Sequence, residues 1–192
     1  MSWLVVVLGY LLGSIPTAYI AGRLLGRGDI RQLGDGNMGA NNAFRQLGPK
    51  VGVTVGIIDA AKGALAILIA KAVAQTTDVS QPVLLITGVA TVIGHNWPVF
   101  LGFRGGEGTS TTIGILVALI TKPMLIMAGP AILTLVLTRN TTPAGAVLFI
   151  PLPFLCLWLD VHGAVVGYSL ALPCLVGITH YLRTRRVAVR RV

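Results

Sequence analysis

The stretch from residue 82 to residue 112 reads PVLLITGVATVIGHNWPVFLGFRGGEGTSTT. It begins with an apolar run that lasts to residue 101, and a helix needs about 20 such residues to cross the ~30 Å hydrocarbon layer of a membrane. Glycines then occupy three of the four positions 105–108, and Glu107 is the fourth. The stretch therefore predicts a membrane helix that ends in a polar, glycine-rich loop.

The composition of the whole chain agrees with a membrane protein. Of its 192 residues, 54% are hydrophobic and 11% are charged, and its mean hydropathy is +0.82. A soluble domain carries about 25% charged residues. We predict an all-α membrane protein, a seven-helix transmembrane bundle with cytoplasmic glycine-rich loops, built as a single domain over residues 1–192. The expected helices cover residues 3–24, 51–74, 82–101, 110–121, 124–138, 145–159 and 162–182.

The basic residues predict the orientation of this bundle. Seven crossings place the two termini on opposite sides of the membrane, and cytoplasmic loops carry an excess of Lys and Arg. The side that holds the C-terminus has most of the basic residues, whereas the other side has mainly Lys71 and Lys122. We therefore expect the N-terminus outside and the C-terminus in the cytoplasm. The residues on the basic side are Arg27, Arg31, Arg45, Lys50, Arg104, Arg139, Arg183, Arg185, Arg186, Arg190 and Arg191.

The same charge distribution argues against a nucleic-acid partner. The net charge is +9, but the basic residues are not interleaved with aromatic residues in the way that single-strand binding requires.

The two cysteines, Cys156 and Cys174, lie inside apolar runs without a His or acidic neighbour at ligand spacing, which is typical of small buried side chains. No metal site or cofactor is predicted.

The first polar segment, residues 28–52, is too long and too polar for a simple connection between two membrane helices. Its glycines permit left-handed backbone, and consecutive amides in such turns form anion-binding nests. A capped amphipathic surface loop is the alternative interpretation. The candidate residues for anion binding here are Gly34, Gly36, Asn37, Gly39, Asn41, Asn42 and Arg45.

The second polar segment combines a histidine with the glycine-rich loop. His95 lies late in the apolar run, where a polar residue often has a functional role. A buried structural histidine is the ordinary alternative. Arg104 and the glycines at 105, 106 and 108 precede Thr109, where the next helix is expected to begin. Free amides at a helix N-terminus attract anions.

Two further groups of polar residues flank these segments. Asp59 and Lys62 lie one turn apart in the second predicted helix, where they can pair with each other, and we expect a structural or supporting role. His180 and Arg183 lie at the end of the last predicted helix. The basic tail that follows suits an anionic membrane surface.

The order of these motifs resembles the bacterial integral-membrane acyl-phosphate:glycerol-3-phosphate acyltransferases. The shared pattern is IRQxGxGNxGAxN, RxLG, DxxKG and GHxxPVFxGFxGGxG, and it covers nearly the whole chain. The resemblance implies a multi-pass enzyme of the bacterial cell (inner) membrane with a cytoplasmic active site. It implies transfer of a fatty acyl group from acyl phosphate to glycerol-3-phosphate, giving lysophosphatidic acid in the first step of phospholipid synthesis. It also implies no metal, no CoA, and a soluble partner enzyme that makes the acyl phosphate.

Several positions depart from the pattern of that family. A serine of the family is Asp35 here, a threonine is Asn41, the lysine of its GGKG motif is Glu107, and an asparagine corresponds to Arg183. A carboxylate in place of a lysine removes an attraction for phosphate of roughly 1.5–3 kcal/mol and adds repulsion. Arg104 and Arg183 are therefore expected to pair with Glu107 and Asp35, or Arg183 to reach the phosphate itself.

The residues and the resemblance together predict two sets of site residues. The candidate catalytic residues are Asp35, His95, Glu107 and His180. Which group removes the proton from the acceptor stays open among a substrate phosphate oxygen, His95 and a carboxylate at 35 or 107. The candidate substrate- and phosphate-binding residues are Gly34, Gly36, Asn37, Gly39, Asn42, Arg45, Arg104, Gly105, Gly106, Gly108, Thr109 and Arg183.

Two other functions are compatible with parts of this sequence. A diverged paralogue would keep the fold but acylate another acceptor, or bind a lipid or anion without catalysis. A small transporter would gather polar residues from several helices at mid-membrane, whereas here they gather on one predicted face, which disfavours transport.

Overall fold

The computed structural model describes residues 3–76 and 80–189, and these residues contain helices and loops but no strand. They form two compact units, Met1–Ile115 with Val176–Val192 and Leu116–Leu175. Helices α6 (Thr109–Leu119) and α10 (Gly163–Val189) each begin in one unit and end in the other. That the two units act as the single domain expected over residues 1–192 stays a prediction.

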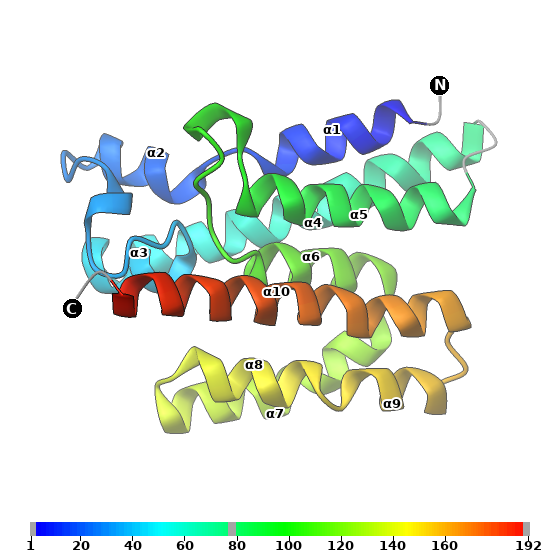
Figure 1. Cartoon of the computed structure of the whole chain (residues 1–192). Coiled ribbons are helices and arrows are strands. Elements are labelled where there is room, and N and C mark those ends of the chain that lie inside the picture. The colour runs from blue at the N-terminus through cyan, green and yellow to red at the C-terminus, as the bar shows by residue number, and fades with distance from the viewer. Residues whose placement is uncertain (1–2, 77–79, 190–192) are drawn as a thin grey trace. The chain divides into compact units, whose positions relative to one another are not determined.

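The helical membrane fold expected from the sequence is confirmed. Every predicted apolar run contains one or two helices, as Figure 1 shows. Within the described residues, six helical stretches are long and apolar enough to span a membrane, and the seventh run, α6, has 11 residues. The six are Leu4–Leu24, Pro49–Gln75, Gln81–Leu101, Thr121–Thr138, Thr141–Trp158 and Gly163–Arg185.

The first predicted helix is interrupted. It consists of α1 (Leu4–Gly13) and α2 (Thr17–Leu24), because Pro16 has no N–H and its ring is incompatible with a continuous helix. At the interruption the carbonyl of Ile15 accepts from the amide of Thr17 at 3.1 Å and from Lys62 Nζ at 2.9 Å. A buried lysine thus satisfies a backbone group that a continuous helix would satisfy internally.

The polar segment after α2 folds into short helices. A 3-10 turn, η1 (Ile30–Gln32), is followed by α3 (Ala40–Leu47), and α4 (Pro49–Thr76) begins two residues later. The sequence did not predict α3, because its glycine and asparagine content is typical of turns. The helix is stabilised by its packing instead: Ala43 is fully buried, and Gly52 of α4 lies against the backbone of Phe44.

Glycines set the close spacing of the long helices in this unit. Helix α1 packs on α5 (Gln81–Asn96) where Gly13 lies against the backbone of Thr91 and Gly94 lies against that of Tyr10. A Cβ at either glycine would overlap those backbone atoms. The small side chain therefore permits the approach, as in other membrane helix pairs.

Helices α4 and α6 meet in the same way. Gly63 lies against the carbonyl of Thr111, and Gly114 lies against the carbonyl of Ala60. These two contacts fix the start of α6 against α4. They thereby also fix the loop that precedes α6, which carries the glycine-rich motif.

The unit Leu116–Leu175 contains α7 (Thr121–Thr138), α8 (Thr141–Phe149), α9 (Leu152–Trp158) and the first half of α10. Helix α7 packs against both α8 and α9. The single helix predicted for residues 145–159 is divided where Pro151 follows α8. Large apolar side chains such as Phe154 and Trp158 are exposed, as expected where lipid is the surrounding medium.

Candidate active site

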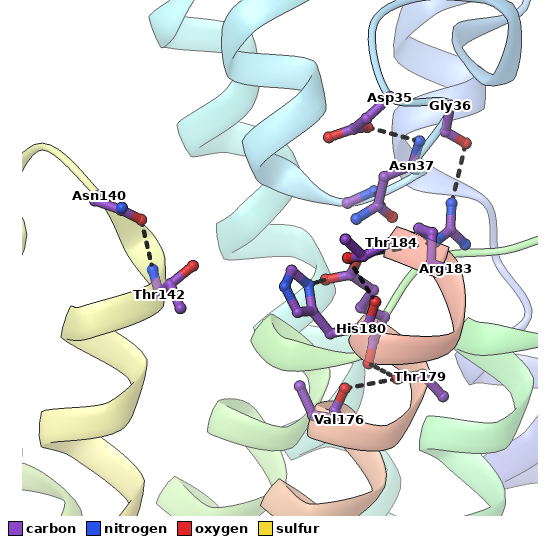
Figure 2. Close-up of polar contacts among 12 residues, drawn as sticks. Asp35, Gly36, Asn37, Asn140, Thr142, Val176, Thr179, His180, Arg183 and Thr184 are labelled. Atoms are coloured by element: carbon purple, nitrogen blue, oxygen red, sulfur yellow. Dashed lines mark hydrogen bonds and ion pairs between the residues drawn. The ribbon is translucent and has the colours of Figure 1, made fainter. Parts of the chain in front are cut away.

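Arg183 connects the two glycine-rich loops. It lies on α10, and its guanidinium donates one hydrogen bond to the carbonyl of Gly36 at 3.1 Å, which Figure 2 shows. It donates another to the carbonyl of Gly105 at 2.5 Å. The planar fork of arginine suits such a double contact. Three segments far apart in the sequence are thus joined within one unit.

Glu107 lies beside this arginine and accepts contacts from α10. Its Oε2 lies 3.0 Å from His180 Nδ1, and its Oε1 lies 3.8 Å from Arg183 Nε. The Thr179 hydroxyl, whose single proton is shared between two acceptors, lies 2.9 Å from the Val176 carbonyl and 3.2 Å from the backbone carbonyl of Glu107. The Glu107 side chain is 17% exposed and the His180 side chain 52%. The negative charge of the loop is therefore balanced by groups from the last helix.

Asp35 is engaged by its own segment. Its Oδ1 accepts from the amide of Asn37 at 2.9 Å, and its Oδ2 forms an ion pair with Arg45 of α3 (Figure 2 shows the Asn37 contact). The expected pairing of Asp35 with Arg104 or Arg183 was wrong: its guanidinium partner is Arg45. The expected pairing of Glu107 with Arg183 is confirmed as a 3.8 Å contact.

Asn42 holds the first loop in shape. Its buried amide nitrogen donates to the carbonyls of Leu33 at 3.0 Å and Asn37 at 2.9 Å. Gly34 and Gly36 have φ of +60° and +71°, which side chains rarely tolerate. The amide of Gly39 donates to the Asn37 side chain at 3.1 Å. Asn42, Gly34 and Gly36 therefore shape this loop, whatever it binds.

The second loop is fixed against the end of α5. The amide of Gly105 donates to the carbonyl of Asn96 at 3.1 Å, and the amide of Gly106 donates to that of His95 at 3.0 Å. A Cβ at Gly106 would overlap the His95 ring, and Gly108 has φ of +82°. Because two of these amides already have protein acceptors, a phosphate bound in this conformation would need other donors.

His95 belongs to a buried ionic cluster. Its Nδ1 lies 3.8 Å from Asp59 Oδ1, and the same oxygen accepts from Lys62 at 2.9 Å and from the Thr17 hydroxyl at 2.8 Å. The Asp59–Lys62 pairing expected from sequence is confirmed. His95, Asp59 and Lys62 are all buried. This buried cluster therefore supports the glycine-rich loop that follows α5.

The start of α6 offers donors that the helix does not use. The first amides of a helix have no intrahelical partner, and α6 begins at Thr109, directly after the loop. Within the described residues, the buried hydroxyls of Thr111 and Thr112 and the buried side-chain amide of Asn96 have no hydrogen-bond partner. The free backbone amides at this helix N-terminus are suited to bind an anion.

The remaining predicted arginine, Arg104, is exposed at the start of the loop. Nearby, Arg31 is bound by Asp29, with 2.7 Å between Arg31 Nη2 and Asp29 Oδ2, and it donates to the carbonyl of Leu101 at 3.0 Å. The hydrogen bonds from Arg31 hold the pKa of Asp29 below its usual value, and the same contact raises the pKa of Arg31. This contact ties the first polar segment to the second.

The structure thus brings most of the predicted site residues together in one unit. Asp35 contacts Asn37 and Arg45, and Glu107 contacts His180 and Arg183. Arg183 links the two groups through the carbonyl of Gly36, whereas His95 lies in the buried cluster. Sequence reasoning missed Thr179 and Thr17. Thr179 could have been found because it directly precedes His180 in the same predicted helix. Nothing in the sequence marks Thr17.

The apolar helices define an integral membrane protein. Its glycine-rich loops carry guanidinium, imidazole and carboxylate groups, which is typical of an enzyme site for an anionic substrate. The family model described as glycerol-3-phosphate acyltransferase matches residues 3–189. The chain belongs to this family and is a membrane acyltransferase.

Individual relatives agree with this assignment. The chain is 47% identical over 186 residues to glycerol-3-phosphate acyltransferase 4 of Dehalococcoides mccartyi, covering 97% of this chain and 98% of the relative. It is similar to the crystal structures of PlsY, an integral membrane glycerol 3-phosphate acyltransferase. The glycerol 3-phosphate form has a TM-score of 0.84 at 30% identity and the lysophosphatidic acid form 0.81 at 29%, and each comparison covers 99% of this chain and 93% of the other.

Proposed function

We propose that this enzyme transfers a fatty acyl group from acyl phosphate to a hydroxyl of glycerol-3-phosphate. The products are lysophosphatidic acid and inorganic phosphate. The similarity to PlsY in its glycerol 3-phosphate and lysophosphatidic acid forms supports this acceptor and product. The acyl phosphate donor is the one that the sequence motifs imply.

The observation that carries the proposal is the connection of three polar segments through Arg183. This residue holds the carbonyls of Gly36 and Gly105 while its own helix presents His180 to Glu107. The connected loops lie next to the start of α6, whose free amides are suited to a phosphate. A substrate with a phosphate and a free hydroxyl, held at this junction, would meet both cationic and proton-accepting groups.

The proposed phosphate contacts combine charge with amide donors. Arg45 lies on α3, the side-chain amide of Asn37 lies on the first loop, and the N-terminus of α6 lies after the second loop. Because Arg45 is paired with Asp35, a bound phosphate must compete with that carboxylate or share the guanidinium with it. We expect this competition to weaken binding of the acceptor.

The protein itself takes little part in the making and breaking of covalent bonds in this reaction. The acceptor oxygen attacks the acyl carbon, the bond from that carbon to the phosphate oxygen breaks, and inorganic phosphate leaves. Holding both substrates with their reacting atoms in contact supplies much of the rate. The candidate residues for proton transfer are Asp35, His95, Glu107 and His180.

The proposed location is the bacterial inner membrane, with the N-terminus outside and the C-terminus in the cytoplasm. The concentration of basic residues on the loop side supports this orientation. A cytoplasmic site would receive acyl phosphate from a soluble partner enzyme. Labelling of single cysteines in the 25–50 and 139–144 segments of intact cells tests it: labelling by an impermeant reagent would contradict it.

The direct test of the function is a two-product assay. The purified protein is supplied with palmitoyl phosphate and glycerol-3-phosphate, and lysophosphatidic acid and inorganic phosphate are measured together. Equal amounts of the two products are expected, with no product from palmitoyl-CoA.

The alternative function is acylation of another acceptor, or anion binding without catalysis. It is favoured by the two carboxylates, Asp35 and Glu107, that stand where the family pattern has serine and lysine. If the wild-type protein gives no product but the Asp35→Ser, Glu107→Lys double variant does, this alternative replaces the proposal.

A further inference from the structure

We propose that Thr17 is a positioning residue for the acyl transfer: through Asp59 and His95 it holds the second glycine-rich loop, residues 105–108, in the position that substrate binding requires. This inference rests on the function proposed above and adds a residue of the first membrane span to that site. Thr17 is only 9% exposed, so it acts through other side chains and is not itself a catalytic residue.

The interruption of the first span directs the Thr17 hydroxyl to another helix. A threonine inside a helix commonly donates to the carbonyl four residues before it, as Thr87 does to Val83 at 2.8 Å. Four residues before Thr17 is Gly13, the last residue of α1, whereas Thr17 is the first residue of α2. The hydroxyl donates instead to Asp59 Oδ1 of α4 at 2.8 Å.

Asp59 gathers three polar groups at one carboxylate oxygen. Its Oδ1 accepts from the Thr17 hydroxyl at 2.8 Å and from Lys62 Nζ at 2.9 Å, and it lies 3.8 Å from His95 Nδ1. Lys62 is on the same helix as Asp59, so the hydrogen bond from Thr17 ties the carboxylate to α2. Without that bond a carboxylate that is 1% exposed loses a donor, and we expect it to turn towards Lys62.

The His95 ring lies between this carboxylate and the loop. Its Nδ1 faces Asp59, and its Nε2 faces Gly106, where an added Cβ would overlap the ring. The His95 carbonyl accepts from the Gly106 amide at 3.0 Å, so the ring and the backbone hold the same residue of the loop. In a close-packed interior a shift of the carboxylate is transmitted to the ring, and from the ring to Gly106.

Gly106 leads directly to the start of α6. Gly108 follows two residues later with φ of +82°, and its carbonyl accepts from the Thr112 amide of α6 at 2.8 Å. A displacement at Gly106 therefore also moves the first amides of α6, which have no partner within the helix. These are the donors that the proposed function assigns to a substrate phosphate, so Thr17 is expected to act on substrate binding.

The first arm of the test is kinetic. Thr17→Val removes the hydroxyl and keeps the branched shape of the side chain. Because it weakens binding of the ground state and the transition state alike, we expect the KM for at least one of the two phosphate-bearing substrates to rise about fivefold, with kcat within about twofold. Thr17→Ser restores the hydroxyl and should return the KM to near the wild-type value. A merely structural role would instead lower the amount of active enzyme, and so kcat, at an unchanged KM.

The second arm measures the loop itself, without substrate. The Gly105 and Gly106 amides donate to the carbonyls of Asn96 and His95, and such hydrogen bonds slow the exchange of amide hydrogens with solvent. Mass spectrometry of peptides that cover residues 99–108 should show faster exchange in Thr17→Val than in the wild type. Exchange in α8, which belongs to the other unit, should stay unchanged.

The third arm is a double-mutant cycle with His95. His95→Ala removes the ring that carries the effect, so Thr17→Val in that background should change the KM by less than about twofold. The exchange measurement needs only Thr17→Val, and it decides the inference even where His95→Ala does not fold.

Thr87→Val is the matched control. Thr87 is fully buried on α5, and its hydroxyl donates to the Val83 carbonyl of its own helix. The substitution makes the same chemical change as Thr17→Val but leaves the contact with Asp59 intact. It should keep the wild-type KM values and the wild-type exchange of the loop. The thermal unfolding temperatures of all variants are measured alongside.

The outcomes separate this inference from the function on which it rests. An active enzyme whose Thr17→Val variant keeps its KM values, or keeps its loop exchange, overturns the role of Thr17 while the acyl transfer stands. An equal rise of the KM in both His95 backgrounds, or an equal effect of Thr87→Val, overturns it as well. A wild-type protein without acyl transfer overturns the proposed function, and the exchange arm then decides by itself whether Thr17 holds the loop.

Discussion

Lys62 Nζ lies 2.9 Å from Asp59 Oδ1 on the next turn of α4, and the two side chains are only 6% and 1% exposed. Removing one partner of a buried pair leaves an uncompensated charge, which costs about 3–5 kcal/mol. We therefore expect Lys62→Met to lower the thermal unfolding temperature in detergent strongly. It also removes the donor to the carbonyl of Ile15 at the α1–α2 break.

The second charge in this pair provides the control. Adding Asp59→Asn to Lys62→Met removes the unpaired carboxylate and should recover much of the lost stability. A double variant no more stable than Lys62→Met would show that the contact with the Ile15 carbonyl, and not the charge pair, dominates.

The contact between α4 and α6 predicts a steric effect at Gly114. A Cβ here would overlap the backbone of Ala60, and overpacking of this kind costs about 1–3 kcal/mol. Gly114→Ala should therefore lower both stability and activity, since α6 carries the glycine-rich loop at its start. Unfolding temperature and acyl transfer are measured on the same preparation.

Gly145 of α8 is the matched control for that substitution. No atom lies within 4 Å of a Cβ built at this glycine, and alanine in a helix interior is favoured over glycine by about 0.5–1 kcal/mol. Gly145→Ala should thus be neutral or slightly stabilising. Equal destabilisation by both substitutions would contradict the steric explanation.

Arg183 is predicted to determine how the two loops meet. Arg183→Lys keeps the charge but loses the fork that binds the carbonyls of Gly36 and Gly105 together. Loss of one such charge-assisted hydrogen bond costs about 1.5–3 kcal/mol. We expect kcat/KM to fall at least tenfold, with faster proteolysis in residues 34–37 as an independent readout. Full activity would exclude a loop-bridging role.

The Asp29–Arg31 contact predicts a dependence of stability on pH. Because Arg31 lowers the pKa of Asp29 in the folded protein, the contact stabilises the fold above the ordinary carboxyl pKa. This stabilisation is lost as the pH falls through the lower, folded value. Asp29→Asn should cost about 1 kcal/mol at neutral pH.

Unfolding measured at two pH values checks this expectation. At neutral pH the Asp29→Asn variant should unfold at a lower temperature than the wild type. Below pH ~3 the difference should shrink, because the wild-type carboxyl is then protonated as well. A difference that stays constant with pH would assign the effect to the hydrogen bond of Asp29 with the Arg31 amide at 2.9 Å.

Much of the fold could be predicted because a membrane helix is encoded locally. The length and polarity of runs such as residues 82–101 define the spans, since the bilayer leaves the backbone few alternatives to a helix. Pro16 lies inside the predicted helix of residues 3–24, but the sequence does not decide whether the helix is divided there. Membrane helices often tolerate proline, and whether one breaks depends on partners such as Lys62 that are distant in sequence.

The sequence by itself determined the membrane fold, the two glycine-rich motifs and the types of side chain near them, because these follow from composition and spacing along one segment. The tertiary structure decided the pairings. Asp35 is matched to Arg45, Glu107 to His180 and Arg183, and His95 to Asp59. The physical reason is that a charge in a site is balanced by whichever opposite charge packing brings within about 4 Å. For Asp35 the turn into α3 brings that neighbour from the same segment, whereas for Glu107 and His95 it comes from a helix far away in the chain.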